Sequence, residues 1–323
     1  MGQGGILILR DSIIQWVLFF FIYCFIGWVW ETIYVSVRKR KFTNRGFMNG
    51  PILPIYGFGA ITILLVTIPV DTSIILTFIV GMIGATVLEY LTGVVMEALF
   101  KVRYWDYSNQ RFNYKGHICL SSSIAWGVAS VLLVNVIQVP IAGWVKAIPR
   151  LVQEITTVFL TIIASFDMAM SIRDALDIKE ILMNIKQNNE EVQKLQKRLD
   201  VWIAVIDDET QNLKQKLEQM VESRQDDETG YFGRKLENMK KRFEVVEKAA
   251  GQFDWKVKGM QHNEVKMEFE GMKEKLLIFI TKRDLRKIRL GKHAGRLLRR
   301  NPYAVSKDYA SELNEVKNLN NDR

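Results

Sequence analysis

Five apolar runs separated by short polar segments occupy the first half of the chain. They cover residues 13–37, 51–70, 73–100, 118–139 and 151–172. Each is close to the roughly 20 residues that a helix needs to cross a bilayer. The first run is too long for a cleavable signal peptide and has no small-residue cleavage site after it. The pattern therefore predicts an all-α polytopic membrane protein with about five transmembrane helices.

The pattern changes at about residue 173, where Lys, Glu, Gln and Asn become frequent at helical spacing. Apolar residues then recur at alternating intervals of three and four, from Ile178 to Met220 and again from Leu236 to Met267. These are the a and d positions of a coiled coil. Residues 226–233 interrupt them. We expect an antiparallel two-helix hairpin over 174–281, with a parallel dimer of two chains as the alternative.

The last region, residues 282–323, begins with a strongly basic segment that contains Leu285, Ile288, Leu297 and Leu298 among its cations. A basic amphipathic helix that binds the anionic inner leaflet is favoured over a protein partner, and both are favoured over nucleic acid. Asn301-Pro302 should end this helix, and Ser306 is placed to cap a short final one. Three domains are thus expected, over 1–173, 174–281 and 282–323.

Charge sets the expected orientation. The chain has 44 Lys and Arg against 35 Asp and Glu, a net charge of +9. Within the apolar half, basic residues gather in residues 38–50 and 101–116, whereas the segment around Asp71 has none, and only Lys146 and Arg150 oppose the trend. Because basic loops stay in the cytoplasm, the N-terminus should lie outside, and the C-terminal half inside.

The apolar runs contain acidic residues, and four of them are Glu31, Glu89, Glu97 and Asp167. An unpaired carboxylate in hydrocarbon is costly, so such residues are functional candidates. With the expected orientation all four lie in the cytoplasmic half, and Glu31, Glu89 and Asp167 agree in depth to within one helical turn. We expect a polar cavity there. The alternative is structural ion pairing with Arg45, Arg103 or Arg173.

An internal repeat favours the cavity. Its positions recur seventy or sixty-six residues later: Gly46, Tyr56 and Gly57 as Gly116, Trp126 and Gly127, and Gly27 and Glu31 as Gly93 and Glu97. Each unit is a span, a basic loop and a second span, so the copies are parallel, a symmetry known in transporters.

The two basic loops add further polar candidates. Residues 43–57 contain three glycines and two prolines near the membrane, and irregular backbone at that depth is tolerated where it lines protein or a wet cavity. The second loop carries Asp106 and Asn113, which an interfacial belt of aromatic residues does not need. The candidate substrate or ion path is therefore Glu31, Glu89, Glu97, Asp167, Asn44, Arg45, Asn49, Arg103, Asp106 and Asn113.

The combined motifs resemble a known bacterial family. They are Phe25-Ile26-Gly27-Trp28-Val29-Trp30-Glu31, then Asn44-Arg45-Gly46, Pro54-Ile55-Tyr56-Gly57, Trp105-Asp106-Tyr107-Ser108, Asn113, Gly116 and Trp126-Gly127. Over about residues 12–170 the chain is similar to membrane proteins catalogued as "putative ABC-transporter type IV permeases". The resemblance implies transport across a bacterial plasma membrane. The charged region after Arg173 is longer than the tails of that family.

The sequence contains none of the motifs of several common enzyme classes. The chain has no Gly-x-x-x-x-Gly-Lys-Ser/Thr loop, so it is not its own ATPase, and it has no Gly-x-Ser-x-Gly, HExxH or paired His-Cys spacing. Cys24 and Cys119 are expected to be buried free thiols, and no cofactor is expected. Three functions stay open: a transporter or permease-like subunit, a membrane scaffold that recruits a cytosolic partner through its coiled coil, and an intramembrane enzyme that acts on a lipid headgroup, with Arg45 and Arg103 on phosphate.

Overall fold

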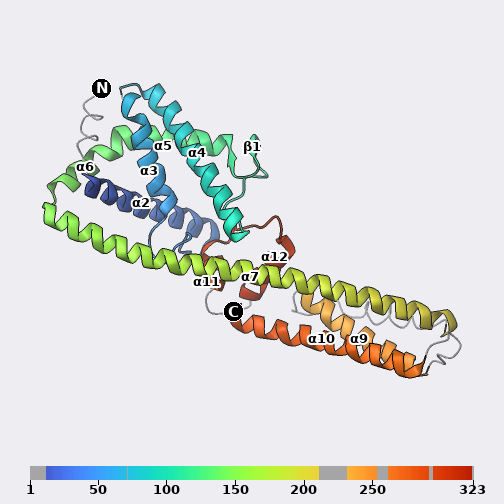
Figure 1. Cartoon of the computed structure of the whole chain (residues 1–323). Helices are drawn as coiled ribbons and strands as arrows, with labels where there is room; N and C mark the ends of the chain where they lie inside the picture. The colour runs from blue at the N-terminus through green and yellow to red at the C-terminus, as the bar shows by residue number, and fades with distance from the viewer. Residues whose placement is uncertain (1–11, 71, 211–230, 253–260, 291–293, 322–323) are drawn as a thin grey trace. The chain divides into compact units, whose positions relative to one another are not determined.

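A computed structural model describes residues 12–70, 72–210, 231–252, 261–290 and 294–321 (Figure 1). The chain divides into two compact units. The first, here called the membrane unit, comprises residues 1–179 and Arg296–Asp308. The second, the helical unit, comprises residues 180–295 and 309–323. The units divide after Lys179, and the region expected to form the tail contributes to both.

The membrane unit is built from helices. They are α2 (Ile13–Lys39), α3 (Pro54–Thr67) with a 3-10 turn (Ile68–Val70), α4 (Ile74–Phe100), α5 (Leu120–Leu132), a π-helical segment η2 (Leu133–Ile137), α6 (Gln138–Ala147) and the start of α7 (Arg150–Thr210). Loop 1, residues 40–53, joins α2 to α3. Loop 2, residues 101–119, joins α4 to α5 and contains the antiparallel pair β1 (Asn113–Tyr114) and β2 (Ile118–Cys119).

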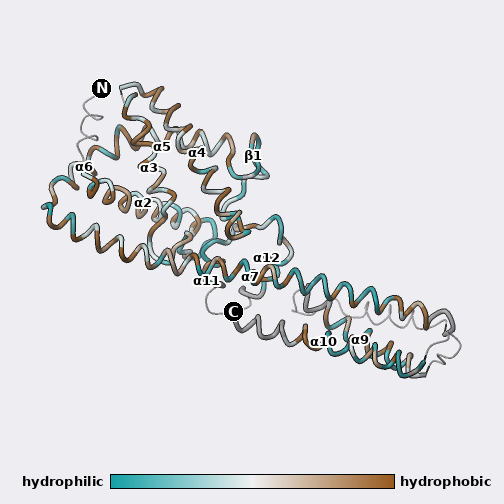
Figure 2. Tube along the Cα trace, viewed as in Figure 1, coloured by the Kyte–Doolittle hydropathy of each residue, from teal (hydrophilic) through white to brown (hydrophobic). Residues whose placement is uncertain are grey.

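The apolar helices are those of a membrane protein. In the described residues, four helical stretches are long and apolar enough to cross a bilayer: Ile13–Lys39, Ile74–Phe100, Leu120–Ala147 and Arg150–Ile206. The helix over Pro54–Val70 is apolar but shorter. Along α7, hydrophobic residues give way to hydrophilic ones (Figure 2). The all-α membrane class is therefore confirmed, while five spans remain a prediction.

The two repeats form similar first helices. Both α2 and α4 have 27 residues. Each begins after a serine whose hydroxyl accepts a main-chain N–H, Ser12 from Gln15 and Ser73 from Leu76, which is a usual N-cap. Each ends at a basic residue in the left-handed region, Arg40 with φ 52° and Lys101 with φ 60°. Local capping thus ends both helices where the loops begin.

Small residues allow the consecutive helices to pack closely, α2 on α3, α3 on α4 and α4 on α5. A Cβ atom at Gly127 of α5 would lie 2.6 Å from the Phe78 ring of α4, and one at its counterpart Gly57 would overlap Cys24 of α2. Close helix approach through small residues is the usual packing in membranes. The opposite face of α4 exposes apolar side chains every four residues: Ile83, Val87, Leu91 and Val95. That face suits lipid.

The helical unit contains residues 180–210 of α7, α9 (Tyr231–Gln252), α10 (His262–Leu290) and α12 (Ala310–Asn321). Its core joins Leu199 and Ile206 of α7, Leu236 and Val246 of α9, and Phe269 of α10. The second arm of the expected hairpin is therefore two helices, because Gln261 is not helical. The expected turn lies largely outside the described residues, and its positions 231–233 start α9. The coiled coil remains a prediction.

The basic segment also differs from the expected single helix. Residues up to Leu290 extend α10, and α11 (Ala294–Arg300) is a separate short helix. Leu297 and Leu298 are only 1% and 4% exposed, so they pack against protein and do not face lipid. The side chains of Leu285 and Ile288 lie outside the described residues. Helix α11 ends at Arg300, next to Asn301-Pro302 as expected, but Ser306 does not cap α12.

Candidate functional site

Glu31 on α2 contacts a tyrosine and an arginine. Its Oε1 accepts a hydrogen bond of 2.9 Å from the hydroxyl of Tyr56, which lies on the first turn of α3. Its Oε2 lies 3.7 Å from Nε of Arg45 in loop 1. Pro54 at the start of α3 fixes the backbone just before Tyr56. Loop 1 therefore delivers both a neutral donor and a cation to the first acid.

Glu89 on α4 has only uncharged hydrogen-bond partners in the described part of the chain. It is 5% exposed. Its Oε1 accepts from the Tyr107 hydroxyl at 3.1 Å, and its Oε2 accepts from Ser122 Oγ at 3.3 Å and Trp126 Nε1 at 3.2 Å. Neutral donors orient a carboxylate without neutralising it. A buried carboxylate of this kind favours a proton or a bound cation.

Tyrosines link these two acids. Tyr56 and Tyr107 each interact electrostatically with both Glu31 and Glu89. The ring of Tyr56 also packs on that of its repeat counterpart Trp126, with centroids 5.8 Å apart. We call Glu31, Tyr56, Glu89, Tyr107 and Trp126 the acid–tyrosine cluster. It brings together one acid from each repeat.

Burial, followed by the nearby charge of Glu89, raises the pKa of Tyr107 well above its usual value. Tyr107 therefore stays protonated at neutral pH and acts as a hydrogen-bond donor. Loop 2 supplies this residue, so the conformation of loop 2 decides whether Glu89 keeps this donor.

Glu97 is paired with cationic and imidazole groups. Arg103 Nε lies 2.7 Å from Glu97 Oε1, without the alignment of a hydrogen bond, and His117 Nε2 lies 3.1 Å from Oε2. Burial and then the charge of Arg103 lower the pKa of His117. These contacts of Glu97 agree with the alternative from the sequence, in which an acid forms a structural ion pair with an arginine.

Asp167 on α7 binds the backbone of loop 1. Its Oδ1 accepts from Asn49 N at 3.0 Å and Asn49 Nδ2 at 2.9 Å, and its Oδ2 accepts from Gly50 N at 2.7 Å. Asn44 closes the same loop, because its Nδ2 donates to Asn49 O and its Oδ1 accepts from Trp28 Nε1. These three predicted site residues hold loop 1 in shape.

Asp106 and Asn113 shape loop 2. Asp106 Oδ1 accepts from the hydroxyl of Ser108 at 2.6 Å and lies 3.4 Å from Arg103 Nη1. Partial burial alone would raise the pKa of Asp106, but the hydrogen bonds from Ser108 and the charge of Arg103 bring it below its usual value. Asn113 donates to the carbonyls of Ser108 and Gln110. Both residues act inside the loop.

The ten predicted site residues thus fall into different groups. Glu31 and Glu89 meet through tyrosines, Arg45 faces Glu31, and Glu97 with Arg103 forms a separate pair. Asn44, Asn49, Asp106, Asn113 and Asp167 hold the loops. Whether all ten line one path remains a prediction. Sequence reasoning missed the roles of Tyr107, His117 and Ser122. Tyr107 stands within the motif of residues 105–108, and His117 directly follows Gly116, whereas Ser122 carried no signal.

Sequence reasoning also missed a contact between the loops and the C-terminal region. We call residues Arg296–Asp308 the strap. Arg45 Nη1 donates to Asn301 Oδ1 at 2.7 Å, and Asn301 Nδ2 donates to Gly46 O at 2.8 Å. In loop 2, Arg103 and Val305 exchange main-chain hydrogen bonds of 2.7 and 2.9 Å. The sequence gives no sign of these long-range partners.

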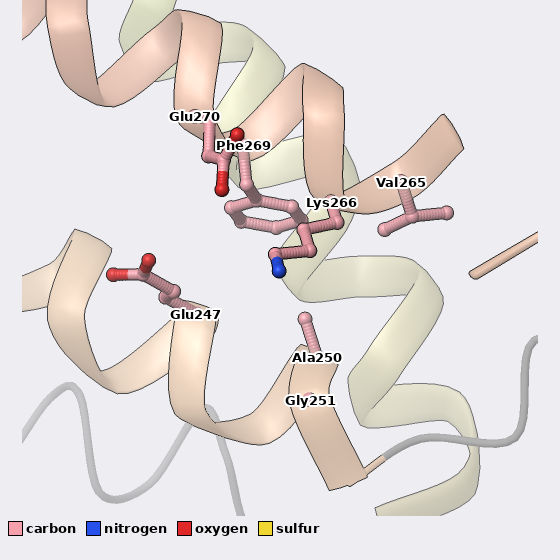
Figure 3. Close-up of a pocket in the computed structure, with 7 residues that line it drawn as sticks. All are labelled: Glu247, Ala250, Gly251, Val265, Lys266, Phe269 and Glu270. Atoms are coloured by element: carbon pink, nitrogen blue, oxygen red, sulfur yellow. The ribbon is translucent and has the colours of Figure 1, made fainter. Parts of the chain in front are cut away.

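A pocket of about 240 Å³ lies between α9 and α10 in the helical unit. Its lining comprises Glu247, Ala250, Gly251, Val265, Lys266, Phe269 and Glu270 (Figure 3). It contains none of the predicted site residues, and its charges of both signs show no single ligand preference. In the described residues, no group of three or more His, Cys, Asp and Glu side chains is arranged to hold a metal ion. The acid–tyrosine cluster is therefore the stronger candidate site.

Comparison with known proteins finds a family model that is similar to the apolar half. Neither a curated protein nor a solved structure matches the chain significantly. A family model does match, over residues 18–172, which include every residue of the acid–tyrosine cluster. Residues 18–172 of this chain are therefore similar to the family described as "Putative ABC-transporter type IV".

Proposed function

We propose that this chain is a transporter or permease-like membrane subunit, and that the acid–tyrosine cluster binds a proton or another cation on its path. The observation that carries the proposal is Glu89, which is 5% exposed among apolar helices and hydrogen-bonded to neutral donors. Its charge needs a compensating proton or cation. The family match to an ABC-transporter type supports the same class.

Flux measurements in liposomes test this proposal. Purified protein should carry protons, read by a pH-sensitive dye inside the vesicle, or one of Na⁺, K⁺ or Mg²⁺, read by an ion-specific dye. Glu89→Gln and Glu31→Gln should reduce that flux strongly, because each keeps the shape of the side chain and loses its charge. Glu154→Gln is the matched control, since Glu154 pairs with Arg150 at the exposed start of α7. Full flux in both cluster variants would contradict the site.

The orientation is part of the proposal. We propose that both basic loops and the helical unit are cytosolic, on the basis of their Lys and Arg content. Single cysteines at positions 71, 108 and 230 would be placed in a background without Cys24 and Cys119. An impermeant maleimide added to intact cells should label position 71 alone. Labelling at 108 or 230 would reverse the orientation.

A scaffold role is the second candidate, and the helical unit favours it. That unit has its own buried core from three helices, which transport through the membrane half does not require. Deleting residues 184–275 separates the two functions: a transporter should keep part of its flux, whereas a scaffold should lose all activity in cells. The enzyme hypothesis gains no support, because Arg45 and Arg103, the expected phosphate ligands, already bind protein groups.

A further inference from the structure

Along the chain, the strap separates the two segments of the helical unit. The chain leaves the membrane unit after Lys179 within α7, returns to it at Arg296, and leaves it again after Asp308. The helical unit is thus linked to the membrane unit by three covalent connections, one through α7 and two through the strap. These connections are the covalent routes between the two units.

The strap holds the first half of loop 1 through Asn301. This side chain is 2% exposed and uses both ends of its amide: Oδ1 accepts from Arg45, and Nδ2 donates to the carbonyl of Gly46. At 2.7 Å, the contact from Arg45 to Asn301 is much shorter than the 3.7 Å contact from Arg45 to Glu31. The contact with Asn301 is thus the shortest of three that place the guanidinium of Arg45 beside Glu31, with the carbonyls of Tyr104 at 3.1 Å and Arg300 at 3.5 Å as the other two.

Helix α7 holds the second half of the same loop. Asp167 accepts hydrogen bonds from the main-chain N–H groups of Asn49 and Gly50. Loop 1 then leads directly to Pro54 and Tyr56, the donor to Glu31. The loop is thus fixed at two places, one on each route to the helical unit.

The strap also fixes the start of loop 2. Arg103 and Val305 form a two-hydrogen-bond bridge, and Ser306 Oγ donates to the Lys101 carbonyl at 2.6 Å. Arg103 pairs with Glu97, and the loop continues to Tyr107, the donor to Glu89. The same thirteen-residue region therefore contacts the loops that serve both acids of the acid–tyrosine cluster.

We propose that the strap transmits the state of the helical unit to the acid–tyrosine cluster, with Asn301 as the positioning residue for Arg45 and loop 1. A partner that binds the helical unit changes the tension on the strap and on α7. Loops 1 and 2 then shift, and with them the donors to Glu31 and Glu89. The use of this coupling in transport rests on the proposed function, whereas the coupling itself does not.

Hydrogen exchange of the full-length protein in nanodiscs, followed by mass spectrometry, tests the coupling without a substrate. Asn301→Ala should speed exchange of loop 1 amides by about tenfold, because it removes two buried hydrogen bonds that hold the loop. Asn135→Ala is the matched control, since that amide is exposed and, in the described residues, its side chain donates to Val131 O, one turn earlier in the chain. Unchanged exchange in peptides of α4 shows that the membrane helices stay folded.

A second variant separates coupling from simple stabilisation. Leu199→Ala with Leu236→Ala removes two buried side chains from the helical core. Its control is Val201→Ala, because Val201 lies on the same helix as Leu199 and is 63% exposed. Loop 1 exchange should rise about fivefold in the double variant, although no residue of the membrane unit has changed. If peptides of α9 and α10 exchange faster while loop 1 stays protected, the strap is a structural staple and the proposal is wrong.

A third variant keeps the test valid if Asn301→Ala does not fold. Ser306→Ala removes a single hydroxyl and should speed exchange in the first residues of loop 2 by a few-fold. Protection equal to wild type there, together with unchanged loop 1 exchange in the double variant, would overturn the proposal. Flux loss in Glu89→Gln is measured separately, so the proposed function and the coupling can fail independently.

Discussion

Glu31 and Glu89 lie on the first helices of the two repeats, but their carboxylates have different hydrogen-bond and ion-pair partners. Glu31 receives a tyrosine hydroxyl and the cation Arg45. Glu89 receives the hydroxyls of Tyr107 and Ser122 and the indole of Trp126. In the second repeat the arginine instead pairs with Glu97, two helical turns further along α4. The two kinds of partner that Glu31 has in the first repeat are thus divided in the second, where Glu89 has the neutral donors and Glu97 has the arginine.

This difference separates an acid with a neighbouring cation from one whose hydrogen-bond partners are all uncharged in the described residues. A carboxylate beside an arginine is already compensated, whereas a buried carboxylate with neutral donors favours protonation or cation binding. The sequence repeat aligned Glu31 with Glu97. The hydrogen bonds of Tyr56 and its counterpart Trp126 instead align Glu31 with Glu89. The structural counterpart of Glu31 therefore depends on which partner is compared.

The largest expected effect is on transport by Glu89→Gln. We expect about a 100-fold loss of flux, against about tenfold for Glu31→Gln, because only Glu89 lacks a cation beside it. Folding should be unaffected in Glu89→Gln, since a neutral amide is easier to bury than a carboxylate. Liposome flux and thermal unfolding measure the two properties. A larger loss in Glu31→Gln would reverse the comparison.

The next effect concerns stability and Arg45. Arg45→Gln should lower the free energy of unfolding by about 3 kcal/mol, because it leaves Glu31 without its cation and Asn301 without its donor. Adding Glu31→Gln should recover part of this loss. No such recovery is expected when Glu89→Gln is added to Arg45→Gln. Denaturant unfolding of the single and double variants gives the coupling energies.

Removing single hydroxyls sharpens the comparison further. Tyr107→Phe should cost about tenfold in flux and Tyr56→Phe about threefold, because Glu31 keeps Arg45 when its tyrosine is lost. Each variant retains the ring, so packing on neighbouring residues is preserved. Equal losses in the two variants would indicate that the acids behave alike. Both are compared with Tyr34→Phe, an exposed tyrosine on α2.

The smallest expected effect is in loop 2. The pKa of Asp106 lies below its ordinary value of 3.8, so its ionised form stabilises the loop above that pH, and this contribution is lost as the pH falls through the lowered pKa. Ser108→Ala removes a hydrogen bond to the carboxylate and should raise the pKa of Asp106. NMR titration of that carboxylate measures the change. At neutral pH the stability loss should be about 0.5–1 kcal/mol.

Local patterns in the sequence determined much of the fold. Apolar runs and serine caps define α2 and α4, and the basic residues after them mark the two loops. The motifs of the membrane half indicated the family whose model matches residues 18–172. Periodicity also found the buried positions of the helical unit, including Leu199 and Leu236. It did not reveal that α9 and α10 are separate helices, because the heptad spacing continues across the break.

The choice of partners was decided only by the tertiary structure. The sequence singled out Glu31, Glu89, Glu97 and Asp167 alike as acids in apolar runs, but one joins a neutral hydrogen-bond network, two face arginines and one binds loop backbone. Asn301 is 256 residues from Arg45 in sequence, so no local spacing predicts their contact. Hydrophobic periodicity records which face of a helix is buried. It carries no information on which distant polar group will meet a given acid, because that depends on how the loops and the strap pack together.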